Sequence, residues 1–390
     1  MTSAPKLGPA YIVAARRTAL ARPGGLHKSR RIESLTSPVV LAALADAGLE
    51  ASAVDEIIFG NTTAGGNPAR IVGLAAGLGE NVPALTVDRQ CASGLDAVLL
   101  GARAVGLGEA RVVVAGGGEA LSTAPWRVAR PKNLFQTPRF LGLEPEDGDA
   151  AAAPHAVTAS ETLARRLGIS RDRQDAFALQ SHLKAERAAG ERRFVREIVP
   201  LRMAPGEARD ERAEYQNLED LAELTPIVLP DGTHTQGNIS ALQEGAAIAV
   251  IVSDEVWAAL GRPHAMRLAA SVTQGVGPSE EARAPVAALE KLMRTNSGFS
   301  RDRLTAVEMS EVSAAQALAV RDAFALEEDQ LNADGGALVR GYPLGAASAV
   351  SLVRLFTRMA RSPQAGQRPY GAVTQGAIGG LGVAALFEAV

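Results

Sequence analysis

The chain has 390 residues, of which 47% are hydrophobic and 21% charged, and its formal net charge is -3 at pH 7. This composition predicts an ordinary globular protein with a large core and two or three domain-sized units, and it argues against disorder. Acidic and basic residues are interspersed, so we expect neither a basic face for nucleic acid nor a polybasic patch for an anionic membrane.

Cysteine and histidine usage excludes several kinds of site. A single cysteine, Cys91, excludes an intramolecular disulfide and a cysteine-rich zinc site, and it fits a reducing compartment, by default the cytoplasm. The five histidines are dispersed without the spacing of helical metal ligands, so we expect no metal. The N-terminus lacks a signal-peptide pattern, and no run of about 18 uncharged apolar residues predicts a membrane span.

Short β-branched runs alternate with Ala/Leu-rich stretches along the chain, which is the pattern of an α/β fold. The first strands are predicted at Ala10 to Ala14 and at Glu56 to Phe59. Between them, Ser37 to Gly48 predicts a helix with Pro38 in its first turn and a glycine just past its end.

The chain contains an internal repeat. In each half a short strand leads through a turn into a helix of small residues, and a second strand then ends at glycines. These elements are Leu85 to Val87, Ala92 to Val105 and Val112 to Ala115 in the first half, and Leu331, Ala346 to Met359 and Gly371 to Thr374 in the second. Two similar α/β halves are therefore expected.

The region between the halves has a different composition, with arginines, prolines and charged loops. Its strongest element is a helix from Arg171 to Ala188, with Ser170 as its N-cap. We expect residues 1–120 plus 243–266 to form the first half, 121–242 an inserted domain of helices and loops, and 267–390 the second half.

Cys91 lies where a predicted strand gives way to a helix. The strand-like stretch Ala84 to Asp88 is followed by Gln90 and Cys91, and a helical pattern begins directly afterwards. A thiol in this position faces a helix N-terminus, where unpaired N–H groups and the macrodipole favour a thiolate and can stabilise an oxyanion. The pattern predicts a nucleophile; the alternative is a small buried apolar residue, the commonest role of a free cysteine.

Several glycine-containing motifs accompany Cys91. They are Cys91-Ala92-Ser93-Gly94-Leu95, Gly116-Gly117-Gly118-Glu119, Gly237-Asn238-Ile239-Ser240, and Gly335-Gly336-Ala337 with Pro343-Leu344-Gly345-Ala346. In this order and spacing the chain resembles a thiolase over nearly its whole length. The resemblance implies two similar βαβαβαββ halves in a five-layered αβαβα arrangement, with an inserted loop domain that binds coenzyme A. It also implies a nucleophilic cysteine that takes an acyl group from a thioester, and Cys91 matches that cysteine.

Three other stretches that the family uses for catalysis are altered in this chain. Ser310 stands at the asparagine that orients a water, with Glu311 beside it. Tyr342 replaces the histidine that activates the nucleophile, and a phenol with a pKa of about 10 is a poor base near neutral pH. Gly376 stands at a second cysteine and cannot carry a proton, and Ile378 replaces a glycine whose N–H lines an oxyanion hole. Because loss of a positioned acid or base typically costs about 10² to 10⁴ in rate, ordinary thiolase turnover is not expected.

The residues expected to bind coenzyme A are mixed. Ser240 matches a serine that contacts the pantetheine arm, and His155 falls at a histidine near the same arm, although either could have a purely structural role. Asn217 stands near the position of the family's adenine-stacking arginine, and Val228 replaces an aromatic residue. Loss of a stacked guanidinium predicts weaker or different binding of coenzyme A.

Three functions compete. We rank first an acyltransferase similar to acetyl-CoA acetyltransferases and 3-ketoacyl-CoA thiolases, in which Cys91 carries the acyl group, Tyr342 and Ser310 polarise the thioester carbonyl, and Glu311 or the acceptor manages the proton. Tyr342 also favours a carbon-carbon lyase, a retro-aldolase acting on a CoA-linked substrate. The third alternative is a catalytically inactive subunit of a complex.

The resemblance also implies the partners. Acyl-CoA is expected as a substrate, without a tightly bound cofactor. A homodimer or homotetramer is expected, with a hetero-complex as the alternative.

Overall fold

The computed structural model describes residues 8–131, 133, 135–141, 156–201, 209–211, 217–296, 299–363, 366 and 369–390. Within these ranges no helix has both the length and the apolar character needed to cross a membrane.

The first half of the chain builds a five-stranded part of the sheet in the order β3-β2-β4-β8-β1. Its elements are β1 (Ala10–Thr18), α1 (Ile32–Ala47), β2 (Glu56–Gly60), α2 (Pro68–Ala75), β3 (Ala84–Val87), α3 (Ser93–Leu107), β4 (Val112–Glu119) and β8 (Gly245–Ser253). Strands β2, β3 and β4 pair in parallel, whereas β8 is antiparallel to both β4 and β1.

The second half repeats this order of elements. It comprises β9 (Met266–Gly275), α8 (Ala284–Thr295), β10 (Leu304–Glu308), α9 (Ala314–Ala323), α11 (Ala347–Phe356), β11 (Tyr370–Ala377) and β12 (Leu381–Ala389). Leu331 forms a parallel bridge with Val307 of β10. Leu331 therefore takes the position beside β10 that β3 takes beside β2 in the first half. The strand order β10-β11-β12-β9 therefore matches β2-β4-β8-β1, and the predicted repeat is confirmed.

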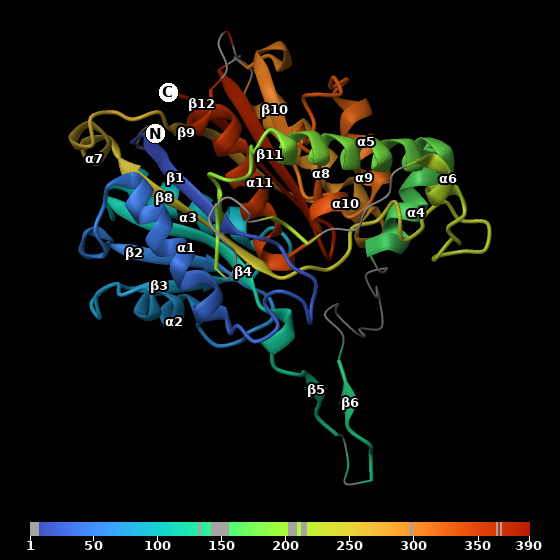
Figure 1. The fold of residues 1–390 in the computed structure, drawn as a ribbon, viewed down its shortest axis with the longest axis horizontal. Helices are drawn as coiled ribbons and strands as arrows, with labels where there is room; N and C mark the ends of the chain where they lie inside the picture. Colours follow the sequence, from blue (N-terminus) through green and yellow to red (C-terminus); the bar gives the residue numbers. More distant parts are fainter. Residues whose placement is uncertain are drawn as a thin grey trace, which may run out of the picture.

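Helices and strands alternate in layers through the molecule (Figure 1). Helices α1 and α2 pack on the outer face of the first half, α3 and α11 contact each other in the middle, and α8 packs on β9, β11 and β12 of the second half. A short pairing of Tyr11 and Ile12 with Arg267 and Met266 joins the two halves into one hydrogen-bonded sheet. This αβαβα arrangement confirms the predicted fold class.

Gly94 shows why the central layer needs a small residue next to Cys91. A Cβ atom added to Gly94 would lie 2.8 Å from the Cβ atom of Ala349 and 2.9 Å from the carbonyl oxygen of Gly345. Any side chain here would push α3 away from α11. The glycine therefore allows the two halves to meet directly behind the nucleophile.

The inserted region lies between β4 and β8. It contains the hairpin β5 (Val128–Ala129) and β6 (Arg139–Phe140), the helices α4 (Ala156–Leu167), α5 (Arg171–Gly190) and α6 (Leu218–Ala222), and the short strand β7 (Ile198–Val199). Figure 1 shows the hairpin projecting away from the body, while α5 crosses the second half. Ser170 caps α5, since its side chain accepts a hydrogen bond from the N–H of Arg173, as predicted. The exact domain limits remain a prediction.

The predicted start of the first helix is wrong. Helix α1 begins at Ile32 and not near Ser37, so Pro38 lies inside it. A proline at this position leaves the carbonyl of Ser34 without its helical donor. The guanidinium of Arg30 donates to that carbonyl instead, at 3.1 Å, which makes an internal proline tolerable.

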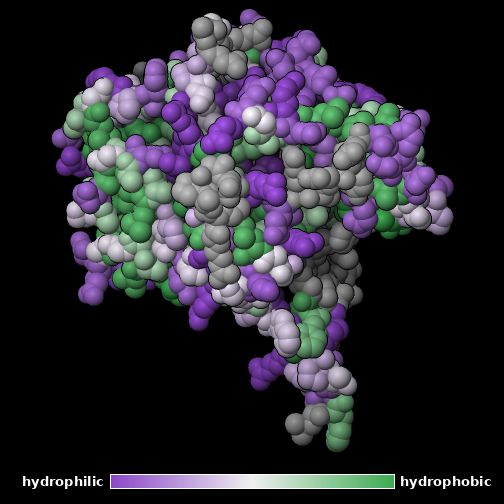
Figure 2. All heavy atoms as spheres, viewed as in Figure 1, coloured by the Kyte–Doolittle hydropathy of each residue, from purple (hydrophilic) through white to green (hydrophobic). Residues whose placement is uncertain are grey.

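Apolar side chains reach the surface of the first half (Figure 2). Ile71 and Leu74 on α2 are 48% and 46% exposed, and Leu85 on β3 is 42% exposed. Among the described residues, strand β3 is the last strand of the sheet at this end and has a strand partner on one side only.

Candidate active site

Cys91 sits in a tight turn between β3 and α3. Gln90 has a φ of 50°, in the left-handed region that a residue with a side chain rarely adopts. Its N–H donates to the carboxylate of Asp88 at 2.8 Å. The hydroxyl of Ser93 accepts from the N–H of Arg89 at 2.8 Å and donates to the carbonyl of Gln90 at 2.6 Å. These bonds hold Cys91 at the start of α3.

The thiol of Cys91 is buried and protonated at neutral pH. Burial raises the pKa of Cys91 to about 12, although a hydrogen bond from Tyr342 and the N–H groups of Ile378 and of Cys91 itself act in the opposite direction. N–H groups that favour a thiolate also favour an oxyanion formed beside it. The site can therefore stabilise negative charge during a reaction, but it does not hold a resting thiolate.

Gln375 orients the hydroxyl of Tyr342. The side-chain nitrogen of Gln375 lies 3.2 Å from the carbonyl oxygen of Ser310, 2.9 Å from that of Gly376 and 2.9 Å from the hydroxyl oxygen of Tyr342. Two carbonyl acceptors require a donor, so the amide orientation is determined and the Tyr342 oxygen accepts from Gln375. The hydroxyl proton of Tyr342 is then free to point at Cys91, the partner that also perturbs its pKa.

The environment of Tyr342 keeps its phenol protonated. Burial, the neighbouring Cys91 and the more distant Glu281 and Glu311 raise the pKa of Tyr342 well above its usual value of 10. The phenol therefore stays protonated and acts as a hydrogen-bond donor.

The motifs seen in the sequence converge on Tyr342. Its N–H donates to the carbonyl of Ala241 at 2.8 Å, and its carbonyl accepts from Gln243 at 3.1 Å. In the residue before Ala241, the N–H of Ser240 donates to the carbonyl of Val312 at 2.9 Å. The stretch 240–243 thus lies between the Ser310 segment and the Tyr342 segment.

A second pair of motifs meets at Glu119. Its buried carboxylate accepts hydrogen bonds from the N–H and hydroxyl of Thr62, both at 2.7 Å, and from the N–H of Gly345 at 3.3 Å. A Cβ atom on Gly345 would lie 2.7 Å from this carboxylate. Glu119 therefore joins the end of β4 to the loop that carries Tyr342.

Ser310 and Glu311 lie behind the site and are already engaged. The hydroxyl of Ser310 donates to the carbonyl of Ala347 at 2.8 Å and lies 3.0 Å from the hydroxyl of Ser351. The buried carboxylate of Glu311 accepts from the side chain of Asn332 at 2.8 Å and from the N–H of Leu338 at 3.3 Å. These contacts give both side chains structural partners, and their catalytic assignment remains a prediction.

Because Gly376 has no side chain, Pro285 and Gln316 pack close to its Cα atom. A Cβ atom on Gly376 would lie 3.1 Å from the ring of Pro285 and 3.3 Å from the side-chain nitrogen of Gln316. Four residues before Pro285, the buried carboxylate of Glu281 accepts a hydrogen bond from the N–H of Gly379 at 2.9 Å. The Glu281 side chain therefore reaches the loop that borders Cys91.

Sequence reasoning missed Gln375 and Glu281. Gln375 immediately precedes Gly376, and a polar residue inside an apolar strand was the available signal. Glu281 follows Ser279 and Glu280 in a charged stretch, which is typical of a solvated surface, so the sequence held no signal for it.

Three of the four predicted coenzyme-binding residues lie in the described part of the chain, and their role remains a prediction. The hydroxyl of Ser240 donates to the carbonyl of Glu311 at 2.6 Å. Asn217 is the N-cap of α6, where its side chain accepts from the N–H of Asp220. Val228 is half-buried in the loop that follows α6. His155 lies outside the described residues.

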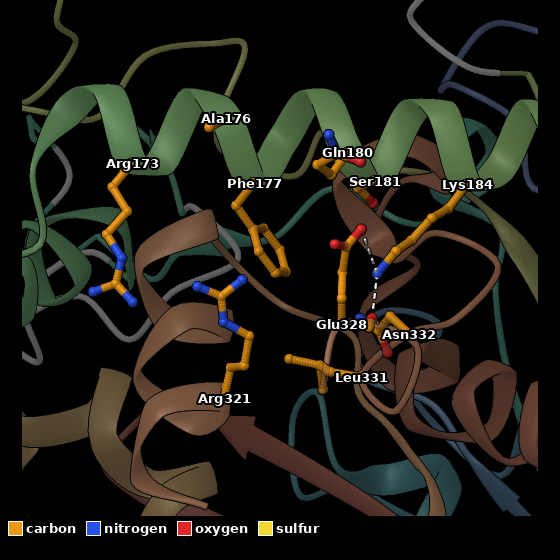
Figure 3. Close-up of a pocket in the computed structure, with 10 residues that line it drawn as sticks. All are labelled: Arg173, Ala176, Phe177, Gln180, Ser181, Lys184, Arg321, Glu328, Leu331 and Asn332. Atoms are coloured by element: carbon orange, nitrogen blue, oxygen red, sulfur yellow. Dashed lines mark hydrogen bonds and ion pairs between the residues drawn. The ribbon is translucent and has the colours of Figure 1, made fainter. Parts of the chain in front are cut away.

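Two cavities lie near these segments. One of about 660 Å³ is bounded by the hairpin side chains Trp126 and Phe140 and by Leu242, whose backbone pairs with Tyr342. A smaller one of about 140 Å³ lies between α5 and the segment that follows α9 (Figure 3). No group of three or more His, Cys, Asp or Glu side chains in the described part of the chain is arranged to hold a metal ion.

The basic side chains that line the smaller cavity each contact a carboxylate or an aromatic ring. In Figure 3, Lys184 reaches Glu328 and Arg321 lies beside Phe177. Arg173 forms an ion pair with Asp322 at 2.7 Å. These contacts attach the inserted domain to the second half.

We predict that Cys91 reacts with iodoacetamide at a rate that rises about tenfold per pH unit from pH 7 to pH 10, without a plateau. The reactive form is the thiolate, and with a pKa of about 12 its fraction grows in proportion to hydroxide throughout this range. Adduct formation can be followed by intact-protein mass spectrometry, with Cys91→Ser as the blank. A plateau near pH 7 would show instead a stabilised resting thiolate.

Comparison with known proteins finds matches along nearly the whole chain. Residues 10–255 match the family described as "Thiolase, N-terminal domain", and residues 262–389 match "Thiolase, C-terminal domain". An acetyl-CoA acetyltransferase of Pseudomonas aeruginosa is 36% identical over 364 residues, which cover 90% of this chain and 92% of the relative.

Two solved structures share the fold. The acetyl-CoA acetyltransferase of Bacillus anthracis superposes with a TM-score of 0.91 at 30% identity, covering 99% of this chain and 100% of the other. Human mitochondrial 3-ketoacyl-CoA thiolase in complex with CoA gives a TM-score of 0.87 at 29% identity, with 98% of each chain covered. Because both thiolase domains match over nearly its entire length, this chain belongs to the thiolase family.

Proposed function

We propose that this protein is an acyltransferase in which Cys91 takes an acyl group from acyl-CoA and passes it to a nucleophilic acceptor. The observation that carries this proposal is the chain of hydrogen bonds from Gln375 to Tyr342 to Cys91 at the start of α3. A thioester carbonyl placed on the sulfur of Cys91 would accept the proton of Tyr342. The N–H groups of Cys91 and Ile378 would stabilise the developing oxyanion.

Claisen condensation is the step that these residues support least. It needs a base for the proton alpha to a thioester carbonyl and an acid for the leaving group. Tyr342 is too weak a base, Gly376 has no side chain, and the hydroxyl of Ser310 is already bound. We therefore infer impaired or altered condensation, with acyl transfer to another nucleophile as the main reaction.

Coenzyme A thioesters are the proposed substrates, and no tightly bound cofactor is required by this chemistry. Ser240 and His155 are the proposed contacts to the pantetheine arm. Asn217 and Val228 offer neither a cation nor a flat ring to the adenine, so binding of the nucleotide part is expected to be weak.

Intact-protein mass spectrometry tests the proposal. Incubation with acetyl-, butyryl- or octanoyl-CoA should add one acyl group to the wild type and none to Cys91→Ser. A chain that stays unmodified with all three donors would contradict acyl transfer and favour an inactive subunit of a complex.

A carbon-carbon lyase is the second candidate, because the hydroxyl of Tyr342 is oriented as a donor and acceptor near the site. It would release an aldehyde or ketone from a β-hydroxyacyl-CoA without forming free coenzyme A and without an adduct on Cys91. Thiol titration of the same reaction mixtures separates the two activities.

We further propose a homodimer as the smallest assembly, formed by the free edge of β3 and located in the cytoplasm, where a lone thiol remains reduced. An edge strand flanked by exposed apolar side chains is suited to pairing with a second copy. The Leu85→Lys variant should run as a monomer in size-exclusion chromatography with light scattering, because a two-fold axis brings like charges together.

Leu107→Lys is the control for this prediction. Leu107 is the last residue of α3, far along the helix from Cys91, and is 55% exposed. Its replacement should therefore leave the assembly intact. A wild-type protein that is monomeric, or a Leu85→Lys variant that remains dimeric, would overturn the proposed interface.

A further inference from the structure

The proposed acyl transfer leaves one proton without a destination. Attack by Cys91 on a thioester releases the thiol proton, and a base is required to accept it. The phenol of Tyr342 is too weak a base, and the carboxylate of Glu311 is bound by Asn332 and Leu338 and covered by Gly336.

Glu281 is a second buried carboxylate, and it reaches the loop that borders Cys91. It lies in the short 3₁₀ turn Pro278–Arg283 and is 5% exposed. Its carboxylate accepts from the N–H of Gly379 at 2.9 Å, while the N–H of the preceding residue, Ile378, faces the sulfur of Cys91. Two consecutive amides of one turn therefore hold the carboxylate and the thiol.

Hydrogen bonds on both sides of Glu281 anchor the 3₁₀ turn that carries it. The N–H of Val276 donates to the carbonyl of Gly380 at 2.7 Å, and the side chain of Gln316 donates to the carbonyl of Ala282 at 3.3 Å. The hydroxyl of Thr374 donates to the carbonyl of Pro285 at 3.1 Å. Residues 276–285 are thus attached to α9, to β11 and to the turn that follows β11.

Electrostatics agree with this placement. The negative charge of Glu281 raises the pKa of Cys91 and also that of Tyr342, so both side chains lie within its field. Glu280, the adjacent glutamate, faces outward and pairs with Arg166 at 2.6 Å on the surface. Glu281 is therefore buried beside the site, whereas Glu280 lies on the surface.

We infer that Glu281 is the proton acceptor for Cys91, a role that rests on the proposed acyl transfer. The Cys91 sulfur forms a bond to the acyl carbon as its proton moves to the carboxylate of Glu281, directly or through one water. The bond from the acyl carbon to the coenzyme sulfur breaks, and the departing sulfur takes the proton from Glu281. Acyl-CoA and the thiol thus become acyl-Cys91 and free coenzyme A, with Glu281 regenerated as a carboxylate.

Glu281→Gln tests this role because the amide oxygen still accepts from the N–H of Gly379 while the charge is removed. The acyl-CoA that gives the wild-type adduct is used, and the rate of Cys91 acylation is followed by mass spectrometry. We expect this rate to fall about 10² to 10³-fold, as for loss of a general base. Alkylation by iodoacetamide at pH 8 should rise several-fold, since a negative charge beside the thiolate has gone.

Glu280→Gln is the matched control and should change neither rate. Glu281→Asp keeps a carboxylate and should retain more acylation than Glu281→Gln, which provides a second test if the amide variant folds poorly. Acylation of Glu281→Gln at the wild-type rate, or an equal fall in acylation and alkylation, would overturn the inference. A wild type that no acyl-CoA acylates would instead contradict the proposed function.

Discussion

Replacement of Tyr342 by phenylalanine is expected to lower the rate of Cys91 acylation about 10² to 10³-fold. Removing one preorganised donor from an oxyanion typically has this effect, because a buried donor needs no reorganisation when charge develops. The ring of Tyr342 remains, so the packing of the site is conserved. The rate is measured with the acyl-CoA that gives the strongest wild-type adduct.

Tyr11→Phe is the control for Tyr342→Phe. The hydroxyl of Tyr11 donates to Asp254 at 3.0 Å in a partly buried contact of the first half, and Tyr11 packs in a different apolar cluster from Cys91. Both variants lose one phenolic hydroxyl, so thermal unfolding should change to a similar extent. A Tyr342→Phe protein that acylates as fast as Tyr11→Phe would show that the hydroxyl does not reach the substrate carbonyl.

Glu308→Gln is expected to stabilise the protein at pH 8 by about 3 kcal/mol and to leave its stability unchanged at pH 4. Glu308 is 2% exposed, and burial raises its pKa from 4.5 to about 7. The unfolded chain releases this proton near pH 4.5, whereas the folded protein retains it until about pH 7. The folded state therefore loses stability as the pH rises from 4.5 to 7, and an uncharged glutamine removes that loss.

The surrounding network explains why the pKa of Glu308 is raised while that of Glu197 is lowered. It joins three buried arginines to four carboxylates, and these residues are Arg17, Arg340, Arg354, Glu197, Asp210, Asp334 and Glu308. Arg17 lies 2.8 Å from Glu197, whose pKa the arginines lower to about 2 despite its burial. One oxygen of Glu308 has no hydrogen-bond partner among the described residues. Glu308 forms no close ion pair among the described residues, so burial outweighs the attraction of the arginines.

Urea unfolding at pH 4 and pH 8 measures the effect of Glu308→Gln. Glu255→Gln serves as the comparison, since its side chain is 77% exposed and its replacement should matter little at either pH. A Glu308→Gln protein that is less stable than the wild type at pH 8 would mean that the ionised carboxylate is needed by Arg340 and Arg354.

Most of the architecture could be predicted because it depends on local patterns. Alternating β-branched and small-residue segments indicated α/β layering, and the repeat of those segments indicated two halves. The start of α1 could not be predicted, since Pro38 is tolerated only through the contact between Arg30 and Ser34. That contact depends on the path of the chain before the helix.

The residues of the candidate site likewise fall into those that the sequence could single out and those that it could not. Cys91, Tyr342 and Gly376 could be singled out from motif order, and residue identity alone predicted the loss of the usual acid and base. Gln375 and Glu281 could not be assigned, because their roles depend on neighbours far away in sequence. The same separation explains why Glu311, expected to manage a proton, has its carboxylate bound by Asn332 and Leu338.

By itself the sequence determined the doubled α/β fold and the placement of its single cysteine at the start of a helix, and it predicted that the usual histidine and second cysteine do not assist it. These are properties of local spacing and side-chain chemistry. Only the tertiary structure decided the protonation of Cys91 and the direction of the Tyr342 hydroxyl. Both depend on burial and on hydrogen-bond partners that come together only when the two halves pack against each other.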